Sequence, residues 1–178
     1  MNIDAILALY YEEGSALLDL LTTHSEMVAR KALAIAETSR LDVDKKFVWD
    51  AAMLHDIGIF RCDAPSIYCT GTEPYIRHGM IGGEMMRGLG SPEIARVCER
   101  HTGSGLTSQE IEEQNLPLPH QDFLPETLEE KLICYADKFF SKSGDLTKEK
   151  PLDKVISQME AFGEDSLRRF MELHHMFG

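Results

Sequence analysis

The sequence lacks both a long hydrophobic run and a basic N-terminal leader. No stretch approaches the roughly 18 consecutive apolar residues typical of a membrane-spanning helix. The first residues, MNIDAILALYYEEG, are acidic instead of basic, so we expect no secretory signal peptide. The sequence therefore predicts neither membrane insertion nor export, and a cytoplasmic location is the default expectation.

Cysteine is scarce, and its spacing is not that of a metal site. The four cysteines are Cys62, Cys69, Cys98 and Cys134, and no two of them form a CxxC pair. CxxC pairs are typical of thiolate zinc sites, and dense cysteine frameworks are typical of small secreted domains. The pattern favours free thiols in a reducing compartment.

Positive charge is also in short supply. The 18 Lys and Arg residues are outnumbered by 30 Asp and Glu residues, so the formal net charge is −12. Broad binding to a nucleic-acid backbone or to an anionic membrane requires a basic face. We therefore expect neither kind of binding. Binding of a small anionic substrate by local positive charge or by metal remains compatible with this composition.

Apolar residues are plentiful, at 43% of the 178 residues, and they recur with helical spacing. The chain is long enough for one domain with a substantial core. No segment shows the alternation of apolar and polar residues that a half-buried strand requires. The predicted fold class is therefore all-α, with a single domain over 1–178. Its core is expected at about 20–142 and its C-terminal helices at about 150–177.

Capping patterns predict where the first helices begin and end. A first helix is expected over about 2–21. The capping box Thr23-His24-Ser25-Glu26 predicts a second helix, with His24 in its first turn. Asp44 is expected to cap a third helix, which should end near Gly58 because Gly is common just past a helix C-terminus.

The second half of the chain shows similar signals. Ser91 followed by Pro predicts another helix start, and Thr127 to Glu130 form a further capping box. Segments 60–74 and 102–126 are predicted as long loops, with one short helix beginning at Thr107. Loops of this length are usually functional, often as lids over a site.

Polar residues occupy the apolar faces of five predicted helices. His55 follows Phe47 and Ala51 on one apolar stripe, and Asp56 is its neighbour in the chain. The other inward positions are His24, His78, His101 and Asp137. A single inward His is more often a hydrogen-bonded core residue, and a single inward Asp often pairs with Lys or Arg.

Taken together, these positions favour a metal site. An unpaired buried carboxylate is costly, so Asp56 requires a partner. Imidazoles and carboxylates without thiolates form a ligand set for Fe, Mn, Zn, Ni or Mg. Neutral His and ionised Asp around a divalent cation would satisfy one another.

The order of these residues resembles that of the HD superfamily of metal-dependent phosphohydrolases. His24 comes first, then the adjacent pair His55-Asp56, then Asp137. The segment HDIG at 55–58 matches one variety of that family letter for letter. The stretches ARVCERHTGSGLT and LPETLEEKLICYADKFFS are similar to small stand-alone HDIG proteins. The resemblance covers about residues 20–142 and implies an HD-domain helical bundle.

The resemblance also implies two metal ions. The first would be held by His24, His55, Asp56 and Asp137. Asp56 would bridge to a second ion held by His78 and His101. The alternative is that His78 and His101 only hydrogen-bond substrate or neighbouring groups.

The implied activity is hydrolysis of a phosphoester or phosphoanhydride of a small molecule, a nucleotide first among the candidates. Hydroxide activated by the metals would attack phosphorus. Lys138, Arg77 and Arg61 are candidates to neutralise the remaining phosphate charge, although for each of them an ordinary salt bridge is the more common role.

Two alternative functions stay open. A di-iron oxygenase of the same superfamily would use the same ligand set, and a nucleotide-sensing module would have no activity. A homodimer is the default expectation if the protein is oligomeric.

Overall fold

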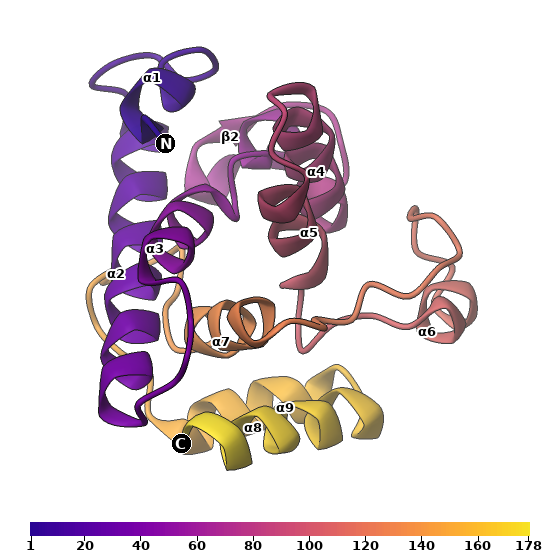
Figure 1. Cartoon of the computed structure of the whole chain (residues 1–178). Helices are drawn as coiled ribbons and strands as arrows, with labels where there is room; N and C mark the ends of the chain where they lie inside the picture. The colour runs from indigo at the N-terminus through magenta and orange to yellow at the C-terminus, as the bar shows by residue number, and fades with distance from the viewer.

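The longest helix of the computed structural model, which describes residues 1–178, is α2 (Ala16–Thr38). It forms one side of the molecule (Figure 1). It packs against α3 (Lys45–Leu54) and α7 (Leu128–Asp137). α3 begins at its predicted cap, because Asp44 accepts a hydrogen bond from the Phe47 N–H at 3.0 Å. These three helices form the frame into which the other elements pack.

The predicted break before Thr23 is wrong. The first helix, α1, is only Ile3–Leu7, and α2 then runs through Thr23 without interruption. Its cap is Ser15, which follows Gly14 in the left-handed region at φ 71°. The apolar stripe is buried both before and after Thr23, so packing against α3 and α7 overrides the local capping signal. His24 therefore lies inside a continuous packed helix, two turns after its start, and not in a first turn.

The remaining helices lie around this frame. Their bounds are α4 His78–Gly88, α5 Pro92–Arg100, α6 Ser108–Glu113, α8 Leu152–Ala161 and α9 Glu164–Phe177. α4 packs on α5, α5 packs on α3 and α7, and α9 packs on both α7 and α8 (Figure 1). The helix start predicted at Thr107 and the capping box predicted at Thr127 are confirmed, and both helices begin with a reciprocal pair of capping hydrogen bonds.

The segment between α3 and α4 has more structure than the loop predicted over 60–74. It contains an antiparallel hairpin of β1 (Asp63–Ala64) with β2 (Cys69–Thr70). A short 3₁₀ turn connects the two strands, and one further 3₁₀ turn lies on each side of the hairpin. Each strand has two residues, too few for an alternating pattern to register in the sequence. The all-α fold class is nevertheless correct, because no other strands occur.

The core is continuous from the central helices to the C-terminal pair. Leu21, Leu54 and Leu132 are fully buried where α2, α3 and α7 meet. Phe170 of α9 is also fully buried and stacks on Tyr135 of α7, with ring centroids 5.6 Å apart. Burying such a side chain contributes about 1.5–3 kcal/mol. α8 and α9 are therefore part of the same packed unit as the frame helices.

The predictions about cysteines and membrane spans agree with the structure. All four cysteines are buried free thiols. None of the helices combines the length and the apolar character that crossing a bilayer would require.

Gly58 allows the segment after α3 to approach α4 closely. A Cβ at Gly58 would lie 2.3 Å from the His78 carbonyl oxygen and 2.6 Å from the Gly82 amide nitrogen. We expect Gly58→Ala to lower the free energy of unfolding by about 1–3 kcal/mol, because backbone has to move. Gly88→Ala is the matched control, since a Cβ there meets nothing within 4 Å. It should be neutral or stabilising by up to about 1 kcal/mol. Equal effects in chemical denaturation would contradict the close approach.

Candidate metal centre

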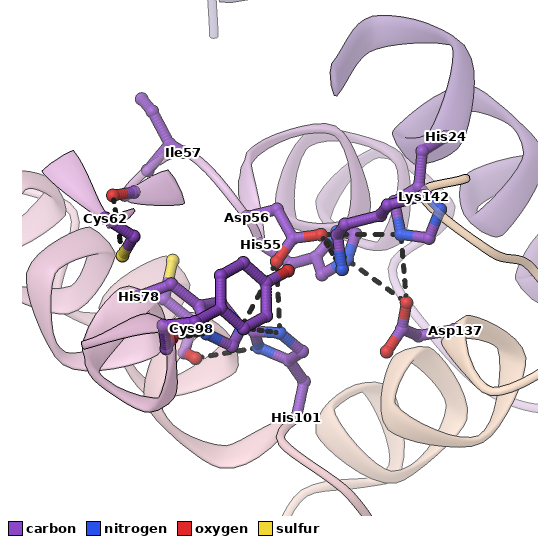
Figure 2. A network of polar contacts seen from close by, with 12 residues as sticks. His24, His55, Asp56, Ile57, Cys62, His78, Cys98, His101, Asp137 and Lys142 are labelled. Atoms are coloured by element: carbon purple, nitrogen blue, oxygen red, sulfur yellow. Dashed lines mark hydrogen bonds and ion pairs between the residues drawn. The ribbon is translucent and has the colours of Figure 1, made fainter. Parts of the chain in front are cut away.

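Four imidazoles and two carboxylates converge where α2, α3, α4, α5 and α7 meet (Figure 2). They are His24, His55, Asp56, His78, His101 and Asp137, and all six are buried. Most of them lie at helix ends, where the chain turns towards the centre of the molecule. The structure therefore brings together every residue that the sequence predicted as a ligand.

The helix ends also orient three of the imidazoles. In His55, His78 and His101 alike, Nδ1 lies 2.6–2.7 Å from the carbonyl oxygen of the residue three positions earlier. Carbonyls accept only, so each Nδ1 donates its N–H and each Nε2 is directed at the site, where it can bind a cation once it carries no proton. Metal-binding imidazoles are typically oriented in this way. His24 differs, because its buried Nδ1 has no hydrogen-bond partner.

The carboxylate of Asp56 lies at the centre of the cluster. Its Oδ2 is 3.1 Å from Nε2 of His55 and 3.4 Å from Nε2 of His24. Its Oδ1 is 3.3 Å from the Nε2 atoms of both His78 and His101. One oxygen of Asp56 thus faces each half of the cluster.

The donor atoms form two compact sets that share Asp56. Within each set the atoms lie within 4.8 Å of one another. The first set is His24, His55, Asp56 and Asp137, and the second is Asp56, His78 and His101. This partition is the one that the resemblance implied for two ions.

The protonation states follow from burial and charge. Burial lowers the pKa of His78 to about 3 and also lowers the pKa of His101, so both are neutral at neutral pH. Burial raises the pKa of Asp56, but the positive charges of His55 and Lys142 outweigh burial and hold it well below its usual value. Burial lowers the pKa of His55, but the charge of Asp56 reverses the effect and raises it to about 9.

Neutral His78 and His101 leave too few protons for the contacts between them. The two rings carry one N–H each, and the backbone carbonyls accept both. Their Nε2 atoms nevertheless lie 3.0 Å apart and face Asp56, so lone pairs face lone pairs. Oδ1 of Asp56 and Nε2 of His55 also lack hydrogen-bond partners, and Oδ2 of Asp56 has an ion pair with Lys142 but no hydrogen bond of good geometry. A divalent cation would satisfy all of these atoms, so the residues present fit the metal site.

A cavity of about 550 Å³ adjoins the cluster. His78, His101 and Asp137 form its inner wall, and residues of α8 and the loop before α8 form its outer wall. Its positively charged residues are Lys138, Lys142 and Lys150, and its apolar residues include Tyr75, Ile76, Phe140, Met159 and Phe162. This volume lies within the usual range of about 300–1,000 Å³ for small-molecule sites.

The predicted phosphate-binding residues have different surroundings. Lys138 lines the cavity, but its Nζ is 2.7 Å from Asp137 Oδ2 and donates to the His101 carbonyl at 2.7 Å. Arg77 does not line the cavity, and its guanidinium pairs with Glu73 at 2.9 Å. Arg61 is exposed on the turn after the HDIG segment. The structure therefore brings only Lys138 to the cluster, and substrate contacts of the two arginines stay predictions.

Lys142 is a site residue that sequence reasoning missed. Its Nζ lies 2.7 Å from Asp56 Oδ2 (Figure 2). Burial lowers the pKa of its ammonium, but the charge of Asp56 raises the pKa above its usual value, so Lys142 is positively charged. It lies beyond α7 in irregular chain, where no helical periodicity could predict its direction.

The fold and the cluster define a helical domain with a buried His/Asp centre suited to divalent metal. The HD domain family matches residues 21–141, more than half of the chain, and the chain belongs to this family.

Similar proteins have two kinds of description. The chain is 38% identical to an uncharacterised protein of Methanocaldococcus jannaschii over 76% of this chain and 70% of that protein. It is 34% identical to a tRNA (cytidine(56)-2'-O)-methyltransferase of Picrophilus torridus, over 88% of this chain and 41% of that protein. The chain is 31% identical to the methyltransferase of the same name from Thermoplasma volcanium, over 94% of this chain and 44% of that protein. The chain thus spans less than half the length of these two methyltransferases. No solved structure matches it significantly.

Proposed function

We propose that the chain is a metal-dependent phosphohydrolase that cleaves a phosphoester or phosphoanhydride of a small molecule, a nucleotide first among the candidates. The observation that carries the proposal is the shared carboxylate of Asp56. It joins two donor sets beside a cavity that contains three lysines. Membership in the HD family supports the same reaction class.

The protein's contribution is to aim preorganised donors at the cations. Bound ions would supply Lewis acidity towards a phosphoryl oxygen and would lower the pKa of a water molecule. Asp56 offers one oxygen to each donor set, and the carbonyl contacts of His55, His78 and His101 hold three lone pairs in place. Lys138 restrains the carboxylate of Asp137. Such preorganisation avoids reorientation during the reaction.

The lysines supply positive charge in an otherwise acidic chain. Lys138 has two acceptors in the protein, and its role is to position Asp137. Lys142 lies in the cavity wall, as does Lys150, whose ammonium donates to Gln158 at 3.0 Å. The formal charge of the chain is −12, so this local concentration of ammonium groups favours an anionic substrate.

The apolar residues of the cavity suit a flat organic group next to the phosphate. Tyr75 stacks on His78 with ring centroids 4.7 Å apart at 22°. Phe162 lines the cavity and is 61% exposed, so its ring is accessible. Aromatic rings can bind a heterocycle by stacking. Both features support a nucleotide over a simple sugar phosphate.

We do not propose methyl transfer for this chain. The two tRNA methyltransferases extend well beyond the part that this chain matches. The residues around the cavity suit divalent cations and phosphate, and the matched region contains the HD domain. We infer that the chain corresponds to the HD portion of those proteins.

Substrate screens with and without oxygen test the proposal. We expect the Mn²⁺-loaded protein to release product from at least one compound among p-nitrophenyl phosphate, its diester, and nucleoside mono-, di- and triphosphates. The reaction should proceed under argon and stop with chelator, because hydrolysis consumes only water. Turnover that requires oxygen would contradict hydrolysis and support the oxygenase. Metal and nucleotide binding without any turnover would support the sensor.

A further inference from the structure

The position of Lys142 has a consequence for metal binding. Its ammonium contacts the same oxygen of Asp56, Oδ2, that faces Nε2 of His24 and Nε2 of His55. The ammonium therefore lies on the side of Asp56 that belongs to the first donor set (Figure 2). Its side chain is only 17% exposed, so water screens its charge poorly.

A divalent cation in the first donor set and this ammonium would compete for the same oxygen of Asp56. Both would take Oδ2 of Asp56 as a ligand or partner. Two positive charges a few ångströms apart in a buried site repel each other strongly. Lys138 cannot substitute for Lys142 in this role, because it is held by Asp137 and by the His101 carbonyl.

Two cavities beside Lys142 leave room for its ammonium to move away from Asp56. Lys142 lines the 550 Å³ cavity beside the cluster and also a second hollow of about 340 Å³. It belongs to the irregular segment between α7 and α8, where Ser143 and Gly144 are exposed and Gly144 has φ 73°. A flexible four-carbon side chain can move from Asp56 into the cavity without a change in the frame helices.

We propose that Lys142 competes with the divalent cation for Asp56, and that cation binding releases its ammonium into the cavity, where it binds an anionic group of the substrate. The competition concerns metal binding alone, whereas the second step rests on the proposed function. Lys142 thus keeps Asp56 neutralised until the cation binds, and metal loading and substrate binding become coupled.

Metal affinity tests the competition. The probe is Mn²⁺, titrated by calorimetry into chelator-stripped protein. Lys142→Met removes the ammonium but keeps a long side chain, so Mn²⁺ should bind about tenfold or more tightly than in the wild type. Lys148→Met is the matched control, because Lys148 is exposed in the same segment and its loss changes the net charge equally. It should alter affinity by less than about twofold. Unchanged or weaker binding to Lys142→Met would overturn the competition.

A measurement on the wild-type chain avoids any folding defect of the variant. Amine-reactive labelling, followed by peptide mass spectrometry, gives the modification rate of each lysine. The rate at Lys142 should rise severalfold when Mn²⁺ is added, since the ammonium leaves a buried ion pair. The rate at Lys148 should stay constant. Equal or slower labelling of Lys142 with metal would contradict its release.

Inorganic phosphate tests the second step. With saturating Mn²⁺, phosphate should bind about tenfold more weakly to Lys142→Met than to the wild type or to Lys148→Met. Equal phosphate affinity in the three proteins would refute the substrate role and leave the competition standing. Failure of both the wild type and Lys142→Met to bind Mn²⁺ would contradict the proposed function and this inference together. Normal wild-type binding with no effect of Lys142→Met would refute only the inference.

Discussion

Asp56→Asn is expected to lose both metal ions and to lower the rate of phosphate release by at least about 1,000-fold. The substitution keeps the size of the side chain but removes its charge, and Asp56 is the one carboxylate that faces both donor sets. A factor of 1,000 corresponds to about 4 kcal/mol of transition-state stabilisation, which is within the range that metal ions supply.

The measurement is metal content by mass spectrometry together with phosphate release at saturating substrate. Asp63→Asn is the matched control, because it makes the same chemical change at an exposed position of β1 near the site in the chain. It should retain full metal content and activity. Circular dichroism verifies that both variants are folded. An Asp56→Asn protein that keeps two ions would remove Asp56 from the bridging position.

His78→Gln is expected to lose one ion and keep the other. His78 belongs only to the second donor set, and the first set retains all four of its donors. Metal content should fall from about two to about one ion per chain, with activity reduced at least about 100-fold because one Lewis acid is lost. The counts come from elemental analysis after removal of loosely bound metal.

His120→Gln provides the control for the loss of an imidazole. His120 is exposed in the loop after α6 and lies outside both donor sets. Its replacement should change neither metal content nor activity. If the wild type and His78→Gln both hold about one ion and the variant loses activity, His78 contacts substrate and the centre holds one ion. If both hold about two ions, His78 is not a metal ligand.

Local signals predicted many of the helix boundaries. Asp44, Thr107 and Thr127 cap helices as expected, because each cap depends on residues within one turn. The box at Thr23 was misleading, since packing of the whole length of α2 against α3 and α7 outweighs a local cap. Sequence periodicity does not measure that balance between packing and capping.

The candidate ligands could be predicted because they are polar residues at positions where the sequence pattern calls for apolar ones. His55, His78 and His101 each interrupt an apolar stripe. Burying such a polar side chain costs free energy unless it has a hydrogen-bond or metal partner. The family resemblance supplied the partition into two sets, and the positions of the two oxygens of Asp56 agree with it.

Lys142 could not be predicted by the same reasoning. It has no periodic pattern, and its contact with Asp56 joins segments that are distant in the sequence. Arg77 illustrates the opposite error. It precedes a ligand in the chain, but its side chain turns to Glu73, because neighbours along a helix point in different directions.

Elemental analysis of the wild-type protein purified without added metal, and again after incubation with Mn²⁺ and removal of the excess, tests the central claim most directly. The claim is that the His/Asp cluster holds divalent cations in two sets sharing Asp56. We predict about two divalent ions per chain after loading. A chain that stays free of metal in both preparations would contradict the claim.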